Sequence, residues 1–232
     1  MPTLTDGPLQ SLLQLTSGGL PTGAFSHSYG LESSVQDGQV HDAATFAEWL
    51  EVHITCGVAP ADGAAVRLVH LAAAAADWAA VVRLDRLLVA LKLAPEIRAA
   101  SLSTGQALLR TAREVFPGER IEQYARLLAR GEARGNAAIV FACVAADLGL
   151  PPSVSVLAYL WSVAASITGV ATRLIPLGAI AAQRVLREAQ PWIRDAAARA
   201  ERRDERALGG WTVGQDIAAL RHERLYSRLC MS

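Results

Sequence analysis

The chain is neutral and moderately apolar. It has 232 residues, of which 52% are hydrophobic and 19% are charged, and its formal net charge is zero. This length fits one large domain or two small ones, and it is enough to bury a core without disulfide bonds. Zero net charge excludes a general attraction of the whole surface to nucleic acid or to an anionic membrane.

The cysteines and the N-terminal segment indicate a cellular compartment. Cys56, Cys143 and Cys230 are odd in number and far apart in the sequence, so no disulfide framework is predicted. We expect Cys56 and Cys143 to behave as small core residues. The first ten residues show no basic stretch followed by an apolar one, so no signal peptide is predicted. These features favour a reducing, cytoplasmic location.

An elaborate motif, SGGLPTGAFSHSYGLE, runs from Ser17 to Glu32. Its Leu20–Gly23 part is a turn signal. Residues 25–32 are then expected to enter a helix in which Ser26 resembles a capping residue. A capped helix start explains the proline, the glycines and one aromatic residue, but it does not explain the remaining polar side chains. We therefore select four residues as candidates for binding a partner: Ser26, His27, Tyr29 and Glu32.

Helical spacing recurs along the middle of the chain, whereas the alternation typical of strands is nearly absent. Phe46, Trp49, Leu50 and Ile54 share one helix face behind Asp42, a good N-cap. The mid-helix Gly105 is expected to mark a close contact with another helix. The remaining expected helices cover about residues 60–76, 78–93, 95–115, 119–130, 136–148, 153–173, 179–208 and 215–226. We expect Pro60 to open the helix over 60–76, Asp77 to cap the helix over 78–93 and Ser153 to cap the helix over 153–173. Pro191 is expected to kink or restart the helix over 179–208.

These elements predict an all-α fold. We expect a single compact helical domain of about eight to ten helices over residues 25–208. An N-terminal arm and turn, residues 1–24, precede it. A C-terminal docking helix and tail, residues 209–232, follow a flexible joint that is rich in glycine.

One long stretch, from Leu148 to Thr172, contains no charged residue. It is long enough to span a bilayer, so an integral membrane protein is one hypothesis. Serine and threonine side chains interrupt the stretch, however, and no basic cluster flanks it on one side. A central helix packed on all sides by other helices explains the same pattern, and we expect no membrane partner.

The second elaborate motif, DIAALRHERLYSRL, runs from Asp216 to Leu229. It combines charge, hydrogen-bonding capacity and an aromatic ring, and tyrosine and arginine are favoured at interface hot spots. The alternative is a helix folded back on its own domain. We favour docking, because chain ends are usually loose unless something ties them down. The candidate partner-binding residues here are His222, Glu223, Tyr226 and Arg228.

Catalytic and metal-binding alternatives find less support in the sequence. The chain has no phosphate-binding glycine loop, so we do not expect it to hydrolyse a nucleotide. A helical hydrolase that uses Ser26/His27 or His222/Glu223 is the second functional hypothesis, although neighbours in sequence rarely form a catalytic pair. His53 and Cys56 could share a metal, but His53 lies on an apolar helix face, so no metal site is expected.

Three segments in order make the chain resemble the UreF family of urease accessory proteins. They are Leu20–Glu32, Arg173–Gly178 with the following Gln183-Arg184, and His222–Leu229. The resemblance covers essentially the whole chain. The sequence departs from the family pattern at Asn136 and Ala179, and at Cys230 with the residue that follows it.

The resemblance implies a fold, a role and partners. Proteins of this family are all-α, tend to form homodimers and are not themselves enzymes. They bind a second accessory protein, UreD (also called UreH), and recruit the GTPase UreG, and the assembly delivers nickel to apo-urease. The complex handles nickel and GTP, and no cofactor is expected in this chain itself. Arg173 and Arg228 become candidate functional arginines because they lie inside the family motifs.

Overall fold

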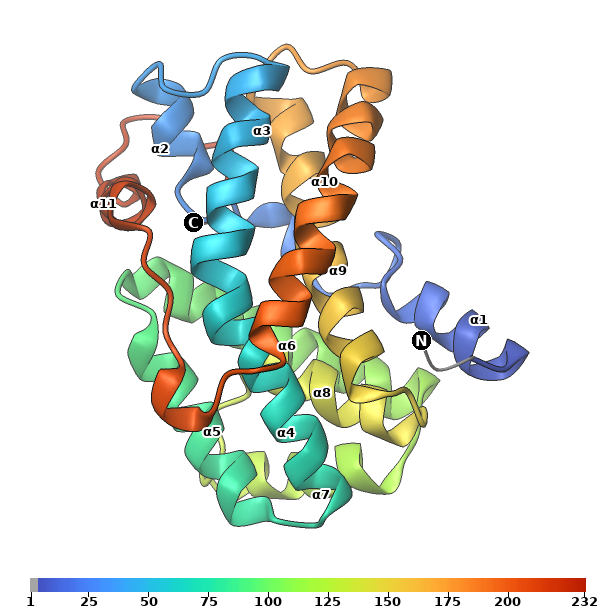
Figure 1. Ribbon diagram of the computed structural model, residues 1–232. Coiled ribbons are helices and arrows are strands. Elements are labelled where there is room, and N and C mark those ends of the chain that lie inside the picture. The colour runs from blue at the N-terminus through green and yellow to red at the C-terminus, as the bar shows by residue number, and fades with distance from the viewer. Residues whose placement is uncertain (1–3) are drawn as a thin grey trace.

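Helices form the framework of the molecule in a computed structural model that describes residues 4–232 (Figure 1). No strand occurs in this range, which confirms the predicted all-α fold. The helices are α1 (Asp6–Leu15), α2 (Leu31–Gln36), α3 (Ala43–Val52), α4 (Ala64–Ala74), α5 (Trp78–Leu91), α6 (Pro95–Val115), α7 (Glu119–Ala129), α8 (Ala137–Asp147), α9 (Pro152–Leu174), α10 (Ala179–Ala200) and α11 (Val213–His222), with 3-10 turns at Ala24–Ser26 and Glu205–Ala207 and a π-helix at His53–Gly63.

One continuous helical rod, made of α3, the π-helix and α4, crosses the molecule (Figure 1). It begins with the predicted cap, since the Asp42 carboxylate accepts a hydrogen bond from the Thr45 amide at 2.9 Å. The expectation that Pro60 opens a separate helix is wrong, because Pro60 lies inside the π-helix. A proline ring clashes with the carbonyl four residues earlier in an α-helix, and the wider π-turn relieves that clash.

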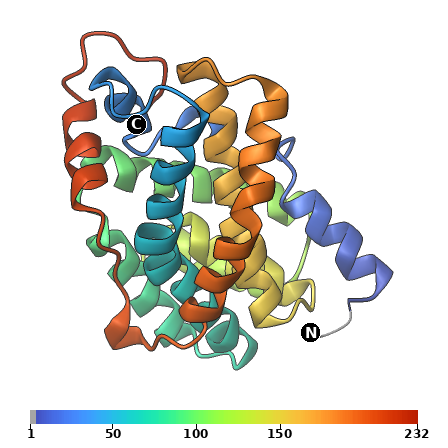
Figure 2. The ribbon, with the colours of Figure 1, turned by 45° about the horizontal axis from the view of Figure 1, so that its top comes forward.

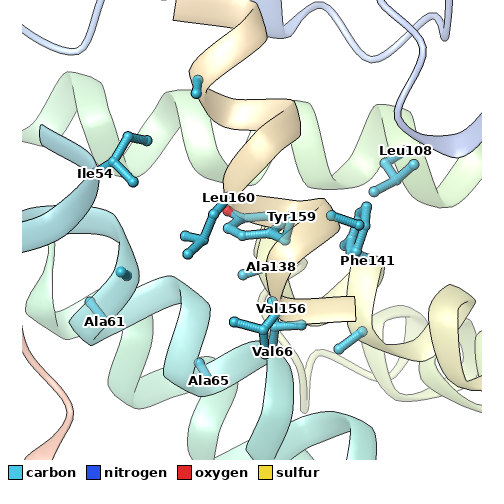
Figure 3. Close-up of a cluster of buried hydrophobic side chains, with 14 of the residues drawn as sticks. Ile54, Ala61, Ala65, Val66, Leu108, Ala138, Phe141, Val156, Tyr159 and Leu160 are labelled. Atoms are coloured by element: carbon cyan, nitrogen blue, oxygen red, sulfur yellow. The ribbon is translucent and has the colours of Figure 1, made fainter. Parts of the chain in front are cut away.

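The core surrounds α8, which is apolar on all sides and buried from Ala138 to Ala146. Helices α4, α6 and α7 pack against it, while α9 and α10 run side by side next to the rod (Figures 1 and 2). Figure 3 shows Val66 of α4, Phe141 of α8 and Tyr159 of α9 meeting in this core. The Phe141 and Tyr159 rings meet edge to face with centroids 5.3 Å apart.

The uncharged stretch forms α9, within the part of the chain that the structure describes. By length and composition, α9 could cross a membrane, but 56% of its most apolar window is buried inside the molecule. It packs against α10, α4, α8 and the π-helix. The expected central helix, packed on all sides, is therefore α8 rather than α9, whose remaining face is partly open.

Two expected helix starts are wrong. Residues 25–32 do not form one helix: His27 is extended after the 3-10 turn, and α2 begins only at Leu31 behind Gly30. Ser26 therefore caps no α-helix. Helix α9 begins at Pro152, and Ser153 is inside it, since proline suits the first helical turn.

The ends of the last helices also differ from the expectation. Helix α10 continues through Pro191 without a restart and ends at Ala200 instead of near residue 208. Helix α11 covers Val213–His222 and stops before Tyr226. Helix α1 was not expected inside the N-terminal arm, and it lies at the edge of the molecule (Figures 1 and 2).

Gly105 of α6 makes the close approach that its position predicted. A Cβ atom built at Gly105 would collide with the Gly135 carbonyl and would lie 2.6 Å from the Ala137 amide nitrogen. The partner is thus the backbone that leads into α8. The buried Asp85 carboxylate holds this backbone segment in place, since its Oδ1 accepts a hydrogen bond from the Asn136 amide at 3.2 Å. The Asn136 side chain in turn caps the start of α8.

Candidate functional site

The two sequence motifs meet in the folded chain. Helix α11 packs against α2, and the C-terminus lies beside α2 (Figure 1). Gly30 permits this approach, because a Cβ atom there would lie 2.9 Å from the Ala219 amide nitrogen of α11. Tyr29 and Gly30 both have positive φ, at 54° and 89°. A positive φ is unusual for a bulky residue such as Tyr29, and backbone strain of this kind is typical of functional segments.

A buried histidine between two carboxylates joins the motifs. His222 is fully buried, with Nε2 2.9 Å from Glu32 Oε2 and Nδ1 2.7 Å from Glu96 Oε2. Both ring nitrogens face carboxylate oxygens, and the imidazolium is the form that donates at both. Arg228 Nη1 donates to the other Glu96 oxygen at 2.9 Å. We call Glu32, Glu96, His222 and Arg228 the tail clasp.

The backbone of the tail completes the clasp. The Glu32 carboxylate also accepts from the Leu229 amide at 2.6 Å and the Cys230 amide at 3.0 Å. Burial alone raises the pKa of Glu32, but these two amides and His222 outweigh burial and hold the pKa below its ordinary value. Glu32 is therefore an ionised, buried acceptor that stabilises the docked tail.

The last residue is attached to the first motif as well. The Ser232 carbonyl accepts from the Ser28 amide and the Ser28 hydroxyl, both at 2.6 Å. The Ser232 hydroxyl lies 3.0 Å from His27 Nδ1. Burial lowers the pKa of His27 and favours its neutral ring. The Ser26 carbonyl accepts from the Met231 amide at 2.8 Å.

The structure divides the nine predicted partner-binding residues into three groups by their exposure. His27, Glu32 and His222 are buried and bond to other parts of the same chain. Ser26 and Tyr29 are partly buried. Exposed side chains are Arg173, which donates to the Phe25 carbonyl, and Glu223, Tyr226 and Arg228.

The exposed surface of the tail is rich in apolar side chains, which lie there beside the charged Arg221, Glu223, Arg224 and Arg228. Of the fifteen large hydrophobic residues exposed in the described part of the chain, seven lie between residues 211 and 231. Three of them, Val213, Ile217 and Leu220, share one face of α11, which we call the outer tail face. The other four are Trp211, Tyr226, Leu229 and Met231. A large exposed apolar patch commonly marks a protein interface.

A cavity that the sequence did not reveal lies beside the π-helix and the start of the tail; its lining is mostly apolar but holds several polar side chains, and we call it the polar cavity for these. It has a volume of about 150 Å³ and is lined by residues that include Tyr29, His53, Asp62 and Lys92. Lys92 Nζ lies 2.8 and 2.9 Å from the two Asp62 oxygens, and both side chains are nearly buried. Burial raises the pKa of Tyr29 and lowers the pKa of His53 to about 4, so His53 is neutral.

Sequence analysis did not predict the cavity: it considered His53 only as a metal ligand, Asp62 is an isolated polar residue in the apolar π-helix, and Lys92 follows the end of α5. Only Tyr29 belonged to a motif. The signal that could have found them is Pro60 within an uninterrupted apolar pattern, since a tolerated proline indicates altered helix geometry. π-Helical segments are frequent at functional sites, so the cavity is a second candidate site.

The histidines considered for catalysis and metal binding contact other groups in the described part of the chain. His27 Nδ1 lies 3.0 Å from the Ser232 hydroxyl. His222 bonds to Glu32 and Glu96, and the Glu223 side chain is exposed. His53 Nδ1 lies 3.3 Å from the Gln215 amide oxygen. Within residues 4–232, no group of three histidine, cysteine, aspartate or glutamate side chains is arranged to hold a metal ion. Cys143 is buried as expected, but the expectation for Cys56 is wrong because it is exposed on the π-helix.

The fold and the clasp define an all-α protein whose C-terminal tail is fastened inward by polar groups and presents apolar groups outward. The UreF family model matches residues 40–190. Urease accessory proteins UreF from Arthrobacter sp. (strain FB24) and Lachnoclostridium phytofermentans are 39% and 37% identical to the chain. These alignments cover 96% of the chain and 96% of the first relative, and 98% of the chain and 100% of the second.

A more distant relative, the UreF protein of Thermosynechococcus vestitus, is 33% identical over 99% of the chain and 100% of its own length. The similarity therefore includes both terminal motifs as well as the helical core. The chain belongs to the UreF family of urease accessory proteins.

Proposed function

We propose that the chain is a scaffold in urease maturation that regulates a partner GTPase during nickel insertion and catalyses no reaction itself. Its partners would be a UreD/UreH-like accessory protein, a UreG-like GTPase and apo-urease, and it would act in the cytoplasm as a homodimer. The relatives, which are named urease accessory proteins, support this role.

The observation that carries the proposal is the two-sided tail. Two of its polar side chains bond within the chain: His222 contacts Glu32 and Glu96, and Arg228 donates to Glu96. Its apolar groups, on the outer tail face, are left to solvent. Burying such a face against a partner releases about 25 cal/mol for each Å² of apolar surface. Because the tail is already folded against its own chain, a partner meets a preformed apolar surface. Binding then costs little of the conformational entropy that ordering a loose tail would cost.

The clasp also bears on how the chain would act on a GTPase. A partner can accelerate a GTPase by donating an arginine or by ordering a catalytic loop. The two motif arginines are both engaged within this chain, Arg173 with the Phe25 carbonyl and Arg228 with Glu96. Both side chains are exposed, so either arginine could exchange its contact within the chain for one with the GTPase.

Binding of the UreD-like protein tests the docking role. Truncation before Asp216 removes most of α11 and the clasp, and we expect it to abolish binding. A milder variant, Ile217→Arg, leaves the clasp intact and places a charge on the outer tail face, and it should weaken binding at least tenfold. Ile180→Arg is the matched control, since Ile180 is 78% exposed on α10. Full-affinity binding by both tail variants, measured by calorimetry, would disprove the docking role.

A further inference from the structure

A second surface lies at the other end of the molecule, between α5 and α7. These helices are far from α2 and the C-terminus (Figure 1). An open groove of about 640 Å³ separates them. It contains no residue of either sequence motif and no part of the polar cavity. The clasp and the outer tail face therefore leave this groove unexplained.

The floor of the groove is apolar. Trp78 and Val82 come from consecutive turns of α5, and Leu127 comes from α7. Trp78 and Val82 are partly exposed, so part of each side chain faces the groove opening. A tryptophan beside aliphatic side chains in a hollow resembles the apolar centre of a protein interface.

Arginines line the rim of the groove. Arg83, Arg86 and Arg130 are all exposed, and Glu132 is the one acidic side chain among the lining residues. Arg130 Nε bonds to the Glu132 carboxylate at 2.5 Å. Arg86 Nε donates to the Glu132 carbonyl at 3.0 Å, which leaves its two terminal nitrogens without a carboxylate partner among the described residues.

The existing ion pairs at the rim are easily exchanged. Arg83 donates to the Glu205 carboxylate from Nε at 2.7 Å and from Nη2 at 2.9 Å, but 57% of the Arg83 side chain is exposed. The Arg130–Glu132 pair is also about half exposed. Exposed pairs of this kind contribute about 0–1 kcal/mol, so an incoming carboxylate can replace them at little cost. Arginine is well suited to this exchange because its planar group binds carboxylates in a bidentate manner.

We propose that the α5–α7 groove binds an acidic peptide segment that carries a bulky apolar side chain, supplied by a protein of the urease maturation assembly. The apolar side chain would occupy the floor beside Trp78, and carboxylates would bind Arg86 and Arg130. Arg86, which has no carboxylate partner among the described residues, and the two exchangeable pairs of Arg83 and Arg130 favour an acidic occupant. The apolar floor selects a peptide over a nucleic acid, whose phosphates would contact only the rim.

Site-specific photo-crosslinking tests this inference. Ala79 is exposed at the groove and can be replaced by p-benzoylphenylalanine, with the exposed Ala179 on α10 as the matched control position. The full-length chain is irradiated with purified UreD-like protein, UreG-like GTPase and apo-urease. We expect position 79, and not 179, to capture one of them through a peptide of net negative charge. Arg86→Glu with Arg130→Glu should reduce the yield at least tenfold, whereas lysine at both positions should preserve most of it.

The choice of proteins offered in this experiment rests on the proposed function. The experiment is designed so that failure of the groove inference can be told apart from failure of the proposed function. UreD-like binding through the tail is measured in the same samples. If the tail binds its partner and position 79 captures nothing above the level of position 179, the groove inference fails alone. Capture of RNA, or of a neutral or basic peptide, also overturns it. If the chain binds none of the three proteins, the proposed function fails, and the inference fails with it.

Discussion

Glu32 accepts three hydrogen bonds at the centre of the tail clasp, from His222 and from the Leu229 and Cys230 amides. A buried carboxylate is costly unless it is fully bonded, and here each bond comes from the tail. Sequence analysis selected Glu32 and His222 by residue type but not their contact, because 190 positions separate them and only the fold brings them together. Asp62 and Lys92 were missed altogether, since no local pattern marks an isolated ion pair.

Replacing Glu32 by glutamine should loosen the tail. The substitution keeps the shape but removes the charge, and charge-assisted hydrogen bonds are worth about 1.5–3 kcal/mol each. We expect the free energy of tail opening to fall by about 2 kcal/mol, which corresponds to roughly 30-fold faster hydrogen exchange at the Leu229 and Cys230 amides. Glu223→Gln, at an exposed position, is the control. Unchanged exchange in Glu32→Gln would refute the role of the clasp.

His53 should make the stability of the chain depend on pH. Its pKa is about 4 in the folded chain and 6.5 ordinarily, because burial disfavours the charged ring. As the pH falls from 6.5 toward 4, the unfolded chain binds a proton before the folded chain does, so stability decreases across this window. Urea unfolding at pH 7.5, 6 and 5 measures the slope. His53→Gln should reduce this slope but not remove it, because burial also lowers the pKa values of His27 and His70. An identical slope in the variant would contradict the assignment.

At the scale of elements, helical periodicity predicted most helices between residues 43 and 200. Helical periodicity failed where tertiary packing overrides a local sequence rule. Pro60 breaks an isolated α-helix, but the π-helix accommodates it within the rod. Helix α1 was missed although Leu9, Leu12 and Leu13 have helical spacing and Pro8 suits a first helical turn. The tail helix ends at His222, earlier than its sequence pattern, because the clasp redirects the chain there.

The crossing of α6 with the backbone before α8 gives a prediction about packing. Gly105→Ala forces a methyl group into the Gly135 carbonyl, and overpacking of this kind costs about 1–3 kcal/mol or more. Gly169→Ala in α9 is the matched control, because no other group lies within 4 Å of a Cβ there. The control should gain up to about 1 kcal/mol from helix propensity. Chemical denaturation measures both, and equal effects would show that the close contact does not exist.

At the scale of the whole molecule, a helical body brings the two sequence motifs together and exposes apolar residues near both ends of the chain. The described part of the chain exposes fifteen large hydrophobic residues; three lie between residues 9 and 25 and seven between residues 211 and 231. Sequence analysis identified these ends as adhesive, but it assigned the adhesion to polar residues. Residue type alone could not show that His27, Glu32 and His222 face inward, because their burial depends on a tail that folds back.

The most direct test of this account is the activation of apo-urease by nickel in a reconstituted mixture with GTP, the UreD-like protein and the UreG-like GTPase. We expect the wild-type chain and Ile180→Arg to support activation equally. Ile217→Arg should reduce the yield of active urease at least tenfold while the folded chain keeps its stability. Full activation by Ile217→Arg would contradict the claim that the outer tail face is where this protein works.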